Sequence, residues 1–232
     1  MARLVLFGSP LSPFVQKVIR ALKWKQLAFD LVQPRGIADF KKWNPQVKKM
    51  PVLQVDGERI YDSTFILRRL DELASGPPLF SADAGEAAAQ HLLEDWADES
   101  LYWHVMALRW TLANASASAD QLLSQLSFPK WLQPLLKWLL TQKITRQARA
   151  QGFARLPAAL LVRELELRLD DLVAVLGRKP FFYADRLSAA DIAVMSQLTF
   201  GGLGTTPEVT RAVEARPNLV EWCKRVEQTT GG

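Results

Sequence analysis

The sequence predicts an α+β domain followed by an all-helical domain. The first third of the chain alternates short β-branched and aromatic runs with amphipathic stretches, whereas from Ala84 onward only helical patterns recur. Between them, Ser75–Asp83 is rich in turn-forming glycine and proline. We therefore expect a first domain at residues 1–76, a linker at 77–84 and a helical domain at 85–232.

Composition limits the class of protein. The chain has 232 residues, of which 49% are hydrophobic and 23% charged, as expected for a soluble globular protein with a substantial core. Its longest nearly apolar stretch, Trp131–Leu140, is far shorter than the roughly 20 residues of a membrane span. With one cysteine, Cys223, and only His91 and His104, a disulfide or structural metal is not expected. These features predict a cytoplasmic protein with no membrane partner and no metal.

The first domain begins with a predicted strand at Arg3–Phe7, which ends at a Gly-Ser-Pro turn. A helix over Phe14–Lys25 follows, with Ser12 as its N-cap and Pro13 in its first turn. Leu27–Val32 reads as a second strand.

The clearest local signal is a hairpin. Two short runs, Val52–Val55 and Glu58–Tyr61, flank the Asp-Gly pair that a tight type I′ turn favours. Asp62 and Ser63 then cap an amphipathic helix that ends near Gly76. The order is therefore βαβ, a loop, and ββα.

Five long segments of the second part show helical patterns, although Pro129 and Pro134 interrupt one of them. The predicted helices are Glu86–Ala115, Ala119–Ala150, Pro157–Leu176, Ala189–Phe200 and Asn218–Glu227. We find no internal repeat.

Positive charge is concentrated in the first domain. Residues 1–80 contain 13 Lys and Arg against 7 Asp and Glu, although the whole chain has a net charge of only +5. The densest lysine cluster comprises Lys41, Lys42, Lys48 and Lys49. A solvated basic face and a site for a small anion both fit this pattern. Nucleic acid is not expected, because no aromatic-and-basic RNA signature or helix-turn-helix pattern accompanies the lysines.

Three short motifs have both a structural and a functional interpretation. Ser12 is either a simple N-cap or a hydroxyl aimed at an anion bound at the helix N-terminus. Met50 precedes Pro51, where a cis bond would present its backbone to a ligand. Asp62 and Ser63 are either a helix cap or a pair that holds an ammonium and a carboxylate.

The joint order of these motifs resembles the cytosolic glutathione transferases, particularly their serine-type, tau-like classes and bacterial relatives. The motifs are Ser-Pro-Phe at 12–14, Asn-Pro-x-x-Lys-Lys-x-Pro-Val-Leu at 44–53, the Asp-Gly hairpin and Asp-Ser at 62–63. In the helical part, the segment at 184–191 resembles the family's structural capping box, with Ser188 and Asp191. The resemblance implies a thioredoxin-like first domain and spans nearly the whole chain.

The resemblance also implies a glutathione site. Ser12 would donate its hydroxyl hydrogen to the glutathione sulfur, and Met50 would pair through its backbone with the cysteinyl unit, before a cis Pro51. The γ-glutamyl group would meet Asp62 and Ser63, and the glycine carboxylate Lys42 and Lys49. Asp62 replaces a more usual Glu or Gln, and Val47 stands where a His is frequent.

Glutathione would be a co-substrate, so no cofactor is expected. The family implies a homodimer and an electrophile site above the thiol. Trp96, Trp103 and Trp110 recur every seven residues, and by family likeness Leu11, Trp103, Met106 and Trp110 line this site; core packing is the alternative, favoured for Trp96.

The expected protein is a glutathione transferase. Through Ser12 it would activate the glutathione thiol as a thiolate, which attacks a hydrophobic electrophile. A glutathione- or apolar-ligand-binding protein without turnover is the alternative. A thiol–disulfide oxidoreductase lacks its nucleophile, because position 12 is Ser and position 15 is Val.

Overall fold

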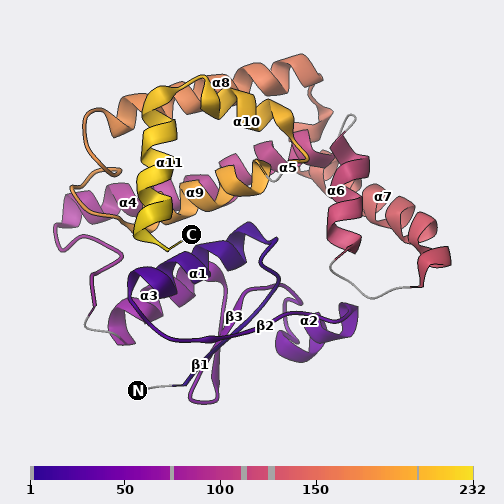
Figure 1. Cartoon of the computed structure of the whole chain (residues 1–232), viewed down its shortest axis with the longest axis horizontal. Helices are drawn as coiled ribbons and strands as arrows, with labels where there is room; N and C mark the ends of the chain where they lie inside the picture. The colour runs from indigo at the N-terminus through magenta and orange to yellow at the C-terminus, as the bar shows by residue number, and fades with distance from the viewer. Residues whose placement is uncertain (1–2, 74–75, 111–113, 125–128, 203, 232) are drawn as a thin grey trace.

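A computed structural model describes residues 3–73, 76–110, 114–124, 129–202 and 204–231. A small sheet with its own helices forms one layer, and a larger group of helices lies against it (Figure 1). The expected order, a mixed α+β part followed by a helical part, is confirmed.

The first part contains four strands and three helices. In chain order they are β1 (Leu4–Phe7), α1 (Pro13–Trp24), β2 (Asp30–Val32), α2 (Ile37–Trp43), β3 (Val52–Val55), β4 (Glu58–Tyr61) and α3 (Ser63–Leu73). The strand order is β2-β1-β3-β4, with β1 parallel to β2 and antiparallel to β3. The predicted hairpin is confirmed, since β3 and β4 pair antiparallel around Asp56 and Gly57.

Strand β2 is shorter than predicted because its first residues close helix α1. Gln26 adopts a left-handed conformation (φ 56°), its N–H donates to the Lys23 carbonyl, and the Leu27 N–H donates to the Leu22 carbonyl. This pair of bonds is a Schellman motif. Leu27 therefore belongs to the helix end, and the strand starts at Asp30.

The second part is helical in the residues described, with one isolated β-bridge between Phe181 and Ala184. Its elements are α4 (Ala84–Trp96), the π-helical η1 (Ala97–Leu101), α5 (Tyr102–Trp110), α6 (Asn114–Leu123), η2 (Lys130–Leu132), α7 (Gln133–Gln151), η3 (Phe153–Arg155), α8 (Ala158–Leu176), α9 (Ala189–Gly201), α10 (Pro207–Glu214) and α11 (Pro217–Thr229). Helix α9 is buried on nearly all sides, which makes it the centre of this part.

Two predicted helices had wrong limits. The Ala119–Ala150 segment is not one helix, because α6 ends at Leu123 and α7 begins at Gln133, near the two prolines. The Glu86–Ala115 segment contains the π-helical η1, and its residues 111–113 lie outside the described part. Helices α2 and α10 were not predicted.

The capping box at the start of α9 is confirmed. Asp191 accepts bonds from the backbone N–H and hydroxyl of Ser188, and also from the Phe182 N–H and the Trp222 indole. The Asp191 carboxylate thus joins the start of α9 both to α11 and to Phe182, in the segment before α9.

A buried ion cluster joins the two parts. The Lys17 ammonium, on α1, has no solvent exposure and contacts the carboxylates of Glu94 and Asp98, the latter at 2.5 Å. Thr64, on α3, donates to Glu94 at 2.6 Å and accepts from Lys17 at 3.2 Å. Gln197 of α9 donates to Asp98 at 3.3 Å. The ammonium of α1 therefore contacts α3, α4 and η1 directly, and α9 joins the cluster through Asp98.

We predict that Lys17→Met lowers the free energy of unfolding by about 3–5 kcal/mol, because it leaves two buried carboxylates without a cation. Urea unfolding measures this change. Lys23→Met, an exposed lysine of the same helix, is the control and should change the stability by about 0.5 kcal/mol or less. Equal effects of the two variants would contradict the role given to the cluster.

Candidate functional site

The strand register gathers the predicted site residues at one edge of the sheet. Phe7, the last residue of β1, pairs with Val52, the first of β3, and Val52 pairs with Tyr61, the last of β4. Segments 8–12, 49–51 and 62–63 therefore leave or enter the sheet at the same edge. The end of β2, which leads toward α2, also lies there, because Val32 pairs with Phe7.

Ser12 begins helix α1 but does not cap it through its side chain. Its backbone has the extended conformation of an N-cap, and its N–H donates to the Ser9 carbonyl at 2.9 Å. The side chain is half-buried. The hydroxyl therefore lies at the positive end of the helix dipole without serving the helix's own N–H groups.

Aromatic packing fixes helix α2 and its lysines. Trp43 is buried and packs against Phe7, with ring centroids 5.0 Å apart. Arg59, on β4, donates to the carbonyls of Lys42 and Trp43 at 3.0 and 3.2 Å. These contacts hold the backbone at Lys42, and its side chain is exposed.

Asn44, which the sequence analysis treated only as part of a motif, shapes the loop that carries Lys49. Its amide donates to the Lys49 carbonyl at 3.0 Å, and its side-chain oxygen accepts from the Val47 N–H at 3.0 Å. Lys49 is exposed, and the Met50–Pro51 bond that follows is cis, as expected.

Asp62 and Ser63 lie at the turn from β4 to α3. Asp62 is exposed and has a left-handed backbone (φ 73°), which Asp tolerates better than most residues. One carboxylate oxygen accepts from the Thr64 N–H at 2.9 Å, the only side-chain hydrogen bond of Asp62 among the described residues. Ser63 is buried. Asp62 is thus a helix cap with a carboxylate still open to solvent.

Tyr102 connects the helical part to the Ser12 segment. Its ring lies 4.9 Å from the ring of Phe14, two residues after Ser12, and 5.1 Å from that of Trp103. Burial raises the pKa of the Tyr102 phenol to about 12, with Glu99 adding to the effect and Arg109 opposing it. The tyrosine therefore remains a neutral, largely apolar wall at neutral pH.

The predicted tryptophan stripe is interrupted between Trp96 and Trp103, whereas Trp103 and Trp110 both lie on α5 and keep their helical spacing. A π-helical turn has more residues per turn than an α-helix, so η1, between Trp96 and Trp103, shifts the register of a seven-residue repeat. Trp110 is 1% exposed and Met106 6%, so both are core residues here. Trp103 and Leu11 are half-buried, so they alone of the four predicted pocket residues are partly open to solvent.

Two other kinds of reactive group in the chain are possible metal ligands and the cysteine thiol. No group of three or more possible metal ligands occurs among the residues described. Cys223 lies on α11, where burial raises the pKa of its thiol to about 11, with Arg20 opposing and Glu227 adding to the shift. It is a thiol at neutral pH. The site is therefore an edge with a hydroxyl, a helix N-terminus, lysines and one carboxylate.

Solved structures identify the fold. Glutathione S-transferase III in its apo form aligns with a TM-score of 0.68 over 100% of this chain and 97% of that one, at 23% identity. FzlA from C. crescentus aligns with a TM-score of 0.67 over 97% of this chain and 88% of that one, at 22% identity. The chain has the glutathione transferase fold.

Sequence comparison finds a family match for the first part of the chain and curated relatives. Residues 6–78 match the family described as Glutathione S-transferase, N-terminal domain. Glutathione S-transferase U9 of Arabidopsis thaliana is 32% identical over 85 residues, 35% of each chain. A probable glutathione S-transferase of Nicotiana tabacum is 30% identical over 104 residues, 44% of this chain and 47% of that one. The matches thus span less than half of these curated relatives.

The raised pKa of Cys223 predicts slow alkylation. A shift from 9.0 to about 11 reduces the thiolate fraction about 100-fold at a given pH below the pKa. Iodoacetamide should therefore label the native protein about 100-fold more slowly than the urea-unfolded chain. Equal labelling rates would show that the thiol is not shielded in the folded state.

Proposed function

We propose that this protein is a serine-type glutathione transferase in which Ser12 stabilises the glutathione thiolate for attack on a hydrophobic electrophile. The observation that carries the proposal is the half-buried Ser12 hydroxyl at the N-terminus of α1, which forms no capping bond. The match of residues 6–78 to the glutathione S-transferase N-terminal domain supports it.

The reaction needs a thiolate. A free thiol with a pKa of about 8.5 is only a few per cent ionised at neutral pH. Lowering this pKa by about 2 units takes roughly 2.7 kcal/mol, which a hydrogen bond to the anion and a helix N-terminus together supply. The Ser12 hydroxyl would donate to the sulfur, and the thiol proton would leave to solvent. The sulfur would then form a bond to the electrophilic atom, while a leaving group departs with its electron pair or a double bond of the electrophile takes up the pair and then a proton from solvent.

The remaining residues of the sheet edge would hold the tripeptide. The Met50 backbone would pair with the cysteinyl unit beside the cis Pro51. The exposed carboxylate of Asp62, with Ser63, would meet the γ-glutamyl group, and Lys42 and Lys49 the glycine carboxylate. This division places the cations against carboxylate and the anion against ammonium.

The electrophile would approach from the helical part. Tyr102 contacts Phe14 beside Ser12, so the start of α5 with Trp103 and Leu11 is the better candidate wall than Met106 and Trp110, which are buried. We further propose a cytoplasmic homodimer, as the resemblance implies. A binding protein of the same fold, without turnover, would retain glutathione and fail to consume electrophiles.

We predict that Ser12→Ala keeps the fold and glutathione affinity but loses about 10²–10³-fold in kcat/KM, since only the hydrogen bond to the thiolate is removed. The ultraviolet absorbance of the bound thiolate should disappear near neutral pH. Ser9→Ala, a second hydroxyl of the same loop, is the control and should retain activity. Loss of turnover in Ser9→Ala but not in Ser12→Ala would contradict the assignment of Ser12 as the residue that stabilises the thiolate.

We also predict that Lys49→Ala raises the KM for glutathione several-fold with little effect on kcat, since a ground-state ion pair is lost. Added salt should weaken glutathione binding by the wild-type protein. Lys224→Ala removes an equal charge from an exposed site on α11 and should leave both constants unchanged. If neither Lys49→Ala nor added salt changed the affinity for glutathione, Lys49 would not belong to the site.

A further inference from the structure

The outward face of helix α7 is not used by the fold. Four large apolar side chains lie exposed on the 3₁₀ turn η2 and the first half of α7, with Trp131 78% and Trp138 58% exposed: Trp131, Leu135, Trp138 and Leu139. Their spacing places them on one face. The opposite face contains Ala148, which is buried.

The same region carries only positive charge. Residues 121–163 contain seven cations and no Asp or Glu: Lys130, Lys137, Lys143, Arg146, Arg149, Arg155 and Arg163. Lys137 pairs with Asp120 of α6. Lys143, Arg146 and Arg149 are exposed in the second half of α7, and no salt bridge involves them among the described residues. The apolar face therefore continues into a cationic one.

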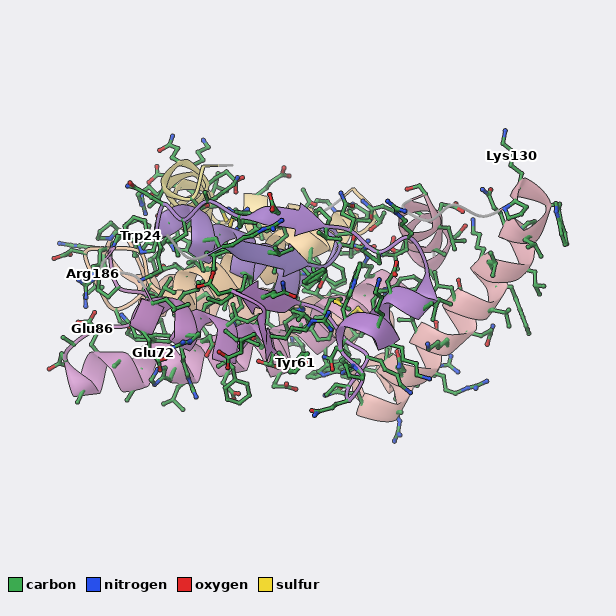
Figure 2. The ribbon with its side chains drawn as sticks, turned by 90° about the horizontal axis from the view of Figure 1, so that it is seen from below. Trp24, Tyr61, Glu72, Glu86, Lys130 and Arg186 are labelled. Atoms are coloured by element: carbon green, nitrogen blue, oxygen red, sulfur yellow. The ribbon has the colours of Figure 1, made fainter. Side chains whose placement is uncertain are left out.

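The helix also forms a projecting end of the molecule. Helices α6 and α7 lie beyond the rest of the helical part (Figure 1), and Lys130 marks an outermost tip, at the end opposite Trp24 and Arg186 (Figure 2). Trp131 follows Lys130 in η2, and Trp138 lies about two turns further along α7, so both belong to this projecting ridge. A flat or yielding surface can meet a ridge of this kind.

We propose that the ridge formed by residues 130–149 binds the surface of an anionic lipid bilayer. The apolar side chains would enter the interface, where Trp is favoured, and the cations would lie along the headgroups. No helix in the described residues is long and apolar enough to cross a membrane, but peripheral binding needs only a helix face. The site departs from the sequence-based expectation of no membrane partner.

Charge argues against the other occupants. A second copy that presented the same ridge would bring cations against cations, with no acid between residues 121 and 163 to pair with them. An acidic helix of another protein would satisfy the charge, but the hollow on this face is lined, among the described residues, by α7 alone. A bound helix would therefore meet a single wall, whereas a bilayer surface needs no second one.

The test is flotation of the purified protein with phosphatidylcholine vesicles, with and without phosphatidylglycerol, at low and high salt. We expect binding only to the anionic vesicles, and release by salt. Lys143→Gln/Arg146→Gln should weaken binding about 30-fold, at about 1 kcal/mol for each cation. Trp131→Ala/Leu135→Ala should weaken it about ten-fold or more.

Matched controls separate the ridge from general surface effects. Arg211→Gln/Lys224→Gln removes two exposed charges from α10 and α11, and Leu167→Ala removes an exposed apolar side chain from α8; both should bind as the wild type. All variants should retain the wild-type melting temperature. Glutathione turnover is measured separately and is expected to be unaffected.

Three results would overturn the proposal. The first is equal binding to both kinds of vesicle, or no loss in the ridge variants. The second is dissociation of an oligomer by Trp131→Ala/Leu135→Ala in light scattering, which would make the ridge an interface between copies. The third is binding of a synthetic amphipathic Leu-Glu helix without binding of anionic vesicles.

Discussion

The structure depends on the burial of one ammonium group between two carboxylates. Burial alone would lower the pKa of Lys17, but Asp98 and Glu94 raise it, so the side chain stays charged. One cation cannot neutralise two carboxylates, and burial, with Glu94 adding its repulsion against the attraction of Lys17, raises the pKa of Asp98. Removing the lysine would leave the acids uncompensated, which makes the position of α1 against α4 and α9 strongly specified.

That constraint reaches the site because α1 carries both groups. Ser12 lies at its first turn and Lys17 little more than a turn further along, so the contact that joins the two parts also positions the hydroxyl. The π-helical η1 acts on the other side: it begins three residues after Glu94, contains Asp98 and resets the register of α5, whose first residue, Tyr102, meets Phe14. The packing of α1 against α4 and η1 therefore determines both how the two parts join and where Tyr102 meets Phe14.

The sequence predicted those features that interactions between neighbouring residues determine. The Asp-Gly hairpin and the capping box at Ser188 could be read from the sequence because a few neighbouring residues fix them. Helix α2 could not, since it has seven residues, exposes Ile37 and is held by the packing of Trp43 on Phe7. A π-helical turn has no signature in a seven-residue repeat, and the acids that meet Lys17 lie 77 and 81 residues away along the chain.

The missing capping bond of the Ser12 hydroxyl also reflects the difference between local and tertiary interactions. Ser before Pro predicted an N-cap, and a side-chain cap contributes about 1 kcal/mol to a helix. Helix α1 forgoes that bond, yet it buries Val15, Val18 and Leu22, and each such side chain contributes about 1.5–3 kcal/mol. Tertiary packing thus outweighs the missing cap several-fold. A helix fixed by its neighbours can leave its first hydroxyl and N–H groups to a ligand, whereas a helix that depended on its cap could not.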